Sequence, residues 1–144
     1  MTGEKSADPE LAARLRVAVG RLHRRIRLDS NDVPPLQLST LVSIQQHGPL
    51  RLGGLAAREA VSAPTMTRVL AALDDRGLII RSPDPADARS TRVELSAAGV
   101  RALGEVRTRR TALLDARLAR LTAEQRAALE AALSALEAMV QDDC

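Results

Sequence analysis

Apolar residues recur at steps of three and four along most of this chain, and this spacing restricts it to a mainly helical fold. The pattern predicts helices over about 9–28, 37–47 and 97–120. A last helix is expected to begin after Thr122, because Thr122 and Gln125 have the spacing of a capping box. The leucine stripes of the first helix and of the last two are longer than one small domain can cover, which favours pairing with a second subunit.

The helix that follows Val61 has the most specific pattern in the chain. Ser62 is a good N-cap, and Pro64 stands where a missing N–H costs nothing. Helical projection gives an apolar face of Met66, Val69, Leu70 and Leu73 and an opposite face of Pro64, Arg68, Ala71 and Asp75. Gly77 is expected to end the helix. One face is thus suited to packing and the other is free for a partner.

Strand composition is confined to a small part of the chain. Residues 78–82 and 90–95 have strand composition, and the prolines and aspartates of 83–89 predict a long loop between them. Residues 50–52 are expected to form a very short strand, and 55–60 a helix of about two turns. The expected fold class is therefore mainly α with a small β-hairpin wing.

Two short helices joined by a tight turn and followed by a hairpin are typical of a winged helix-turn-helix. The free face of its second helix would enter the major groove of double-stranded DNA, where Thr65, Thr67 and Arg68 reach base edges or phosphates. Pro64 is small enough to let the backbone approach closely. Ser62 is expected to cap the helix rather than to read a base.

The hairpin carries the remaining candidate contacts. Arg89 is expected at the tip of its loop, with Arg81 and Arg92 on either side. An arginine on a protruding loop suits a narrow minor groove, where the electrostatic potential is most negative. Pairing with a nearby acid on the protein surface is the alternative role for such an arginine.

Composition excludes several other classes of function. The chain has no Phe, Tyr or Trp, so aromatic stacking on bases or ligands is ruled out. Its only cysteine is Cys144, and His23 and His47 stand alone, so neither a metal site nor a cofactor is expected. The usual elements of an enzyme active site are missing. With no signal peptide and no membrane-spanning run, a cytoplasmic location is expected.

Residues 52–99 resemble the DNA-binding core of the MarR family of bacterial transcription regulators. The matching pieces are Leu55-Ala56, Val61-Ser62 with Thr65, Thr67 and Arg68, Asp75 to Leu78, the wing run Asp84-Pro-x-Asp87-x-Arg89, and Leu95-Ser96 with Gly99. The resemblance implies that 63–76 is the recognition helix, that Arg89 enters the minor groove, and that Asp87 orients Arg89. It also implies an obligate homodimer.

These expectations define three regions and a set of partners. Residues 1–35 and 97–144 would supply the dimerisation helices, and 36–96 the winged helix-turn-helix. The dimer would bind a pseudo-palindromic operator as a repressor, with a small-molecule effector between the helical and winged regions. Two alternatives stay open, a ligand-independent DNA-binding regulator and a winged helix that binds another protein. Arginine makes up all 21 basic residues except Lys5, which suits a phosphate-bearing partner.

Overall fold

The computed structural model describes residues 8–30 and 33–141. The elements follow the order α1 (Pro9–Ser30), α2 (Pro35–His47), β1 (Leu50–Arg51), α3 (Leu52–Arg58), α4 (Ala63–Asp75), β2 (Ile79–Asp84), β3 (Asp87–Leu95), α5 (Ala97–Leu118) and α6 (Ala123–Val140). The mainly helical fold with a β wing that the sequence predicted is confirmed.

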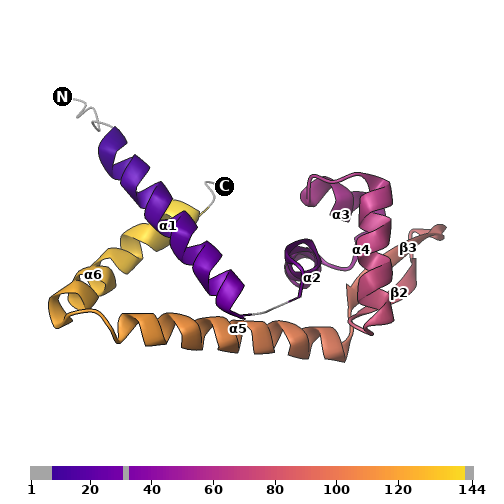
Figure 1. Cartoon of the computed structure of the whole chain (residues 1–144). Helices are drawn as coiled ribbons and strands as arrows, with labels where there is room; N and C mark the ends of the chain where they lie inside the picture. The colour runs from indigo at the N-terminus through magenta and orange to yellow at the C-terminus, as the bar shows by residue number, and fades with distance from the viewer. Residues whose placement is uncertain (1–7, 31–32, 142–144) are drawn as a thin grey trace, which may run out of the picture.

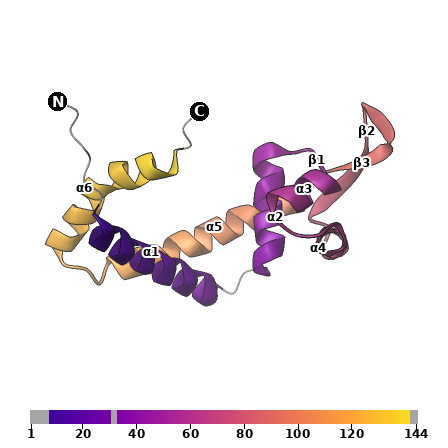
Figure 2. The same ribbon diagram turned by 90° about the horizontal axis from the view of Figure 1, so that it is seen from above.

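Two groups of elements lie at opposite ends of the molecule, and α5 runs between them (Figure 1). At one end, α2, α3 and α4 form a small helical cluster beside the strands. At the other end, α1 crosses α5 at an angle and meets it near the C-terminal end of α1, and α6 turns back from the end of α5. The view from above shows the hairpin of β2 and β3 projecting away from the rest of the chain (Figure 2).

The sheet has three antiparallel strands in the order β1-β3-β2. In β1, Leu50 and Arg51 lie opposite Val93 and Arg92 of β3, so the very short expected strand completes the sheet. The prediction of a long hairpin loop was wrong, because β2 continues to Asp84 and β3 begins at Asp87. Proline is tolerated in β2 because this strand lies at an edge of the sheet.

Helix caps explain why three of the helices begin where the sequence predicted. Ser62, Ser96 and Thr122 each accept a hydrogen bond on the side-chain oxygen from the backbone N–H three residues later. In addition, the Gln125 side chain accepts from the Thr122 amide, which completes the expected capping box. At the end of α4, Gly77 adopts a positive φ of 69°, a conformation that favours glycine.

The core is aliphatic and belongs mainly to the winged region. Its fully covered members come from α2, α3, α4 and β3, and the largest are Leu41, Leu55, Met66, Leu70, Leu73 and Val93. The same contacts fix the orientation of α4, because its apolar face is buried in this core. Its opposite face is therefore left at the surface.

The N-terminus of α5 joins the winged region to the long helices through close backbone contacts. The Ser96 hydroxyl donates to the Gly77 carbonyl at 2.6 Å, and the Ser96 amide donates to the Leu78 carbonyl at 3.1 Å. A Cβ atom on Gly99 would lie 2.1 Å from the same Leu78 oxygen. The absence of a side chain at Gly99 thus permits this approach between α5 and the turn before β2.

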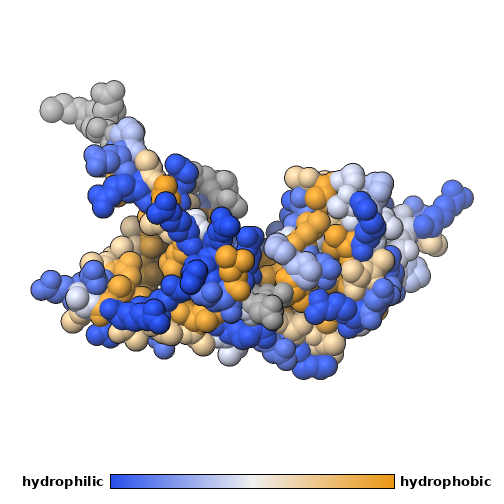
Figure 3. All heavy atoms as spheres, viewed as in Figure 1, coloured by the Kyte–Doolittle hydropathy of each residue, from blue (hydrophilic) through white to orange (hydrophobic). Residues whose placement is uncertain are grey.

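The helices at the far end leave much apolar surface uncovered. No residue of α6 is buried, and Leu133 and Val140 are 51% and 80% exposed. On α1, Leu11, Val19 and Leu22 are also exposed. Apolar side chains gather on the surface around α6 and the adjoining part of α5, whereas the end of the hairpin is hydrophilic (Figure 3). None of the described helices is long and apolar enough to cross a membrane.

Candidate nucleic-acid interface

The exposed surface of α4 begins with a network of hydroxyl groups. Ser62 Oγ accepts from the Thr65 amide at 3.3 Å and lies 2.9 Å from Thr65 Oγ1, to which it donates. Thr65 Oγ1 therefore keeps its own hydrogen for an outside acceptor such as a phosphate oxygen. The positive end of the helix dipole lies at the same place and favours an anion.

Thr67 lies two residues after Thr65 on α4, and its hydroxyl is available as an acceptor rather than as a donor. Its Oγ1 donates to the Ala63 carbonyl at 2.9 Å, so the remaining lone pairs can accept a hydrogen bond. The backbone–side-chain bond also fixes the direction of the hydroxyl. Thr65 and Thr67 thus offer a donor and an acceptor on the same turn of helix.

Arg68 extends the polar face of α4 and is exposed. Pro64, Ala71 and Asp75 are exposed with it, as the helical projection predicted, whereas Met66 and the other apolar residues face the core. A helix with small residues and one arginine on its free face can approach a groove closely and still reach base edges.

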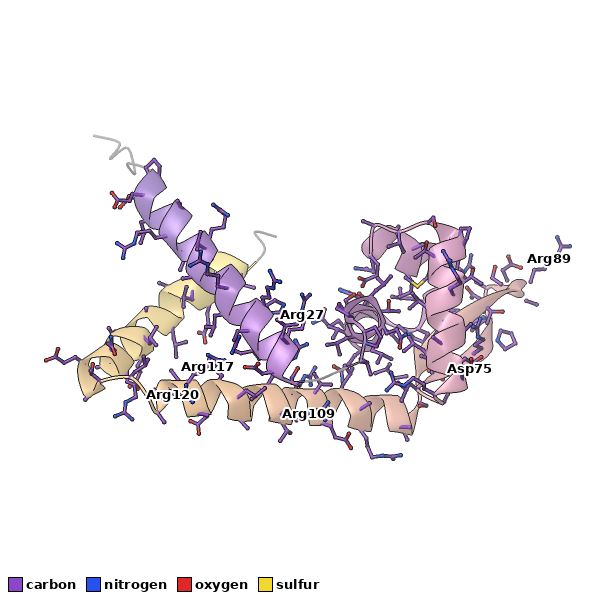
Figure 4. All side chains as sticks on the ribbon, in the orientation of Figure 1. Arg27, Asp75, Arg89, Arg109, Arg117 and Arg120 are labelled. Carbon is purple, nitrogen blue, oxygen red and sulfur yellow. The ribbon has the colours of Figure 1, made fainter. Side chains whose placement is uncertain are left out.

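Arg89 lies on the part of β3 that projects furthest from the domain (Figure 4). Sequence reasoning placed it in a loop, but the structure places it within the strand. Opposite β2, the register passes from Pro83 paired with Thr91 to Asp84 paired with Asp87. Residues 88–90 are therefore additional residues on β3, and they bulge from the end of the hairpin.

Asp87 holds this bulge through its backbone. Its Oδ1 accepts from the Arg89 amide at 3.0 Å, and its Oδ2 accepts from Ser90 Oγ at 3.2 Å. Within residues 8–30 and 33–141, the Arg89 guanidinium makes no hydrogen bond or ion pair. Asp87 thus orients the chain that carries Arg89, and the guanidinium extends into solvent.

Arg81 and Arg92 are not brought together with Arg89. Arg81 Nε lies 3.3 Å from Asp74 Oδ2, so this arginine ties β2 to the last turn of α4. Arg92 Nε is buried, and no group in the described part of the chain accepts a hydrogen bond from it. Arg81 is therefore engaged in an ion pair within the winged region, whereas Arg92 is held with its Nε buried.

Two acidic residues to which the sequence analysis gave no role, Asp84 of the wing run and Glu59, are central to the geometry. Asp84 is buried at the base of the hairpin turn, where hydrogen bonds from the Ala86 amide and Arg51 hold its pKa below the usual range. Glu59 accepts from Ser39 Oγ and Ser43 Oγ, both at 2.6 Å, and thereby ties α3 to α2. Neither pairing follows from sequence spacing, since the partners lie 16 to 33 residues apart.

A cavity of about 530 Å³ lies between the long helices and the winged region. Its lining is contributed by α1, α2, the end of α3 and α5, and includes Arg27, Leu36, Val42, Glu59 and Arg110. Figure 4 shows Arg27 at the end of α1 that faces α2. No group of three or more potential metal ligands occurs within the part of the chain that the structure describes.

The model of the MarR family matches residues 33–91 of this chain. A helix-turn-helix transcriptional regulator from Mycobacterium bovis is 38% identical over 138 residues, which cover 94% of this chain and 96% of that protein. The chain belongs to the MarR family. This membership confirms the resemblance found in the sequence, and it identifies the protein with transcription regulators.

Solved structures of transcription regulators share the fold of nearly the whole chain. A transcriptional regulator from Pseudomonas aeruginosa is 35% identical with a TM-score of 0.79, and the match covers 96% of this chain and 99% of that one. A mutant of MepR from Staphylococcus aureus, crystallised with an oligodeoxyribonucleotide, has a TM-score of 0.67 at 19% identity. That match covers 91% of this chain and 98% of MepR, and it shows the shared fold.

Proposed function

We propose that this MarR-family chain is a homodimeric, sequence-specific DNA-binding repressor whose recognition helix is α4. The observation that carries the proposal is the free face of α4, where Thr65, Thr67 and Arg68 surround the helix N-terminus. Arg89 extends from the same end of the molecule, on the hairpin beside α4 (Figure 4). A helix for the major groove and an arginine for the minor groove are the two contacts that such a regulator requires.

The second copy is proposed from the apolar surface of α1 and α6. Leu129, Leu133 and Val140 are exposed at helical spacing on α6, although a monomer in water would be expected to cover such a stripe. A second chain that pairs through α1, α5 and α6 would cover it on both subunits at once. Two recognition helices would then enter successive major grooves, with half-sites about 10 bp apart.

An effector site is proposed at the cavity beside Arg27 and Arg110. Its walls combine guanidinium groups with aliphatic side chains, which suits a small anionic ligand with an apolar body. Because α1 and α5 line one side and α2 the other, a ligand there would bias the spacing between the helical and winged regions. A coupling of about 1 to 3 kcal/mol would change DNA affinity roughly 5- to 150-fold.

The DNA assignment is tested by comparing two arginine variants in fluorescence-anisotropy titrations. Arg68→Ala is expected to cost roughly 1 to 3 kcal/mol and to reduce the preference for the operator over a scrambled duplex. Arg89→Ala should weaken binding to both duplexes and reduce the slope of log affinity against log salt by about 1. Arg120→Ala, at the far end of the molecule, is the control. Unchanged affinity in both Arg68 and Arg89 variants would remove their DNA assignment.

The effector proposal has its own test with defined compounds. A panel of small aliphatic and aromatic carboxylates is added to the protein–DNA complex at constant ionic strength, and release of labelled DNA is measured. A releasing compound should lose its effect in Arg27→Ala, while DNA binding without the compound is retained. Calorimetry showing that no member of the panel binds would favour a ligand-independent regulator.

A further inference from the structure

Two arginines lie directly opposite each other on neighbouring strands of the wing. Arg51 of β1 pairs in register with Arg92 of β3, next to the pair formed by Leu50 and the buried Val93. Because side chains alternate along a strand, both arginines belong to the face of the sheet that turns away from the core. Like charges in such a pair are destabilising, so this arrangement requires a nearby acid.

Asp84 supplies that acid. Its side chain is only 7% exposed, Oδ2 accepts from Arg51 Nε at 2.5 Å, and the charge of Arg92 also favours the ionised form. Oδ1 accepts from the Ala86 amide at 2.8 Å. One carboxylate therefore links β1 to the turn that ends β2, and it balances the charge of the arginine pair.

The same carboxylate lies at the base of the bulge that carries Arg89. Asp84 is opposite Asp87, and the residues of β3 between Asp87 and Thr91 have no partner on β2. Asp87 holds the bulge from within by accepting from the Arg89 amide. The base of the bulge is therefore fixed on both strands, by Asp84 on β2 and by Asp87 on β3.

We propose that Arg51 and Asp84 form a positioning pair that fixes the direction in which Arg89 leaves the wing. The pair itself does not touch DNA. It orders the turn in advance, so that less conformational entropy is lost when Arg89 enters a groove. The proposal rests on the proposed function for its consequence in DNA binding, but the ordering of the wing can be measured on the free protein.

The first measurement is NMR relaxation of backbone amides in the free dimer. In the wild type, the amides of Ala86, Ala88 and Arg89 are expected to show order parameters near 0.8, close to those of rigid backbone. In Asp84→Asn, which keeps the size of the side chain, values at these amides should fall towards about 0.6, while α4 is unchanged. Unchanged order parameters at the wing would overturn the proposal, whatever the DNA result.

The second measurement is a double-mutant cycle with DNA. In the wild-type background, Arg89→Ala should lower affinity about tenfold, whereas in Asp84→Asn it should lower affinity by less than about threefold. Equal losses in both backgrounds would contradict the positioning role. Asp115→Asn is the matched control, because it makes the same charge change at an exposed site of α5.

Arg51 provides a second pair of variants if Asp84→Asn fails to fold. Arg51→Gln should reproduce the loss of order in the wing and the smaller effect of Arg89→Ala on affinity. Arg51→Lys, which keeps a cation, should retain part of the order and part of the effect of Arg89→Ala.

Failure of the proposed function and failure of the positioning pair can be told apart. If the wild type binds no DNA but the wing loses order in these variants, the proposed function fails and the structural role stands. If the wild type binds DNA and no variant alters order or coupling, the positioning pair fails.

Discussion

Gly99 and Gly104 lie on the same helix, α5, and the structure predicts opposite results for the same substitution at the two positions. A Cβ atom on Gly99 would lie 2.1 Å from the Leu78 carbonyl oxygen and 3.1 Å from the Leu78 carbonyl carbon. These are backbone atoms, and the oxygen already accepts from the Ser96 amide. A Cβ atom on Gly104 would meet no atom within 4 Å.

The expected change in the free energy of unfolding at Gly99 follows from two opposing effects. Overpacking against backbone costs up to about 3 kcal/mol, from which the better helix propensity of alanine removes at most about 1 kcal/mol. Gly99→Ala should therefore destabilise the protein by about 2 kcal/mol. Gly104→Ala has only the propensity term and should stabilise it by up to about 1 kcal/mol. The two variants should differ by about 3 kcal/mol.

Thermal unfolding at one protein concentration is a suitable assay, since the melting temperature of an oligomer depends on concentration. At roughly 3 °C per kcal/mol, the melting temperatures of the two variants should be separated by about 10 °C, with the wild type between them. Urea unfolding provides the check that both transitions have the same slope. Equal melting temperatures would contradict the close approach of α5 to the Leu78 carbonyl.

Two further predictions concern the dimer and the wing. Leu133→Asp should convert the dimer to a monomer in sedimentation at micromolar concentration, whereas Ala131→Asp, on the opposite face of α6, should not; a wild-type monomer with intact DNA binding would contradict the dimer. Because the pKa of Asp84 is lowered in the folded protein, its ionised form should add stability above its ordinary value of about 3.8 and lose it as pH falls below that value. The urea midpoints of wild type and Asp84→Asn should therefore differ at pH 6 and converge towards pH 2, and a constant difference would exclude this role.

Local signals in the sequence predicted much of the fold. Ser62, Ser96 and Thr122 each mark a helix start through a hydrogen bond that spans three residues, so the local pattern contains the whole interaction. The two faces of α4 were predicted for the same reason, because burial follows the helical period. Arg68 lies on the exposed face of α4, as its place in the helical period predicts.

Longer-range pairing could not be predicted in this way. Pro83 and Asp84 have loop composition, yet both belong to β2, because an edge strand tolerates proline and because Asp84 bonds to the Ala86 amide and to Arg51. Register and ion pairing between strands depend on residues that are distant in sequence. The bulge at Arg89 and the role of Arg51 therefore emerged only from the structure.

One titration decides whether this chain is a sequence-specific DNA-binding regulator. The purified protein is titrated by fluorescence anisotropy against the DNA upstream of its own gene and against a scrambled duplex of equal length, at two salt concentrations. Tighter, saturable binding to the upstream duplex is the expected result, with both affinities falling as salt rises. Absence of binding to either duplex at both salt concentrations would contradict the account and favour a winged helix that binds another protein.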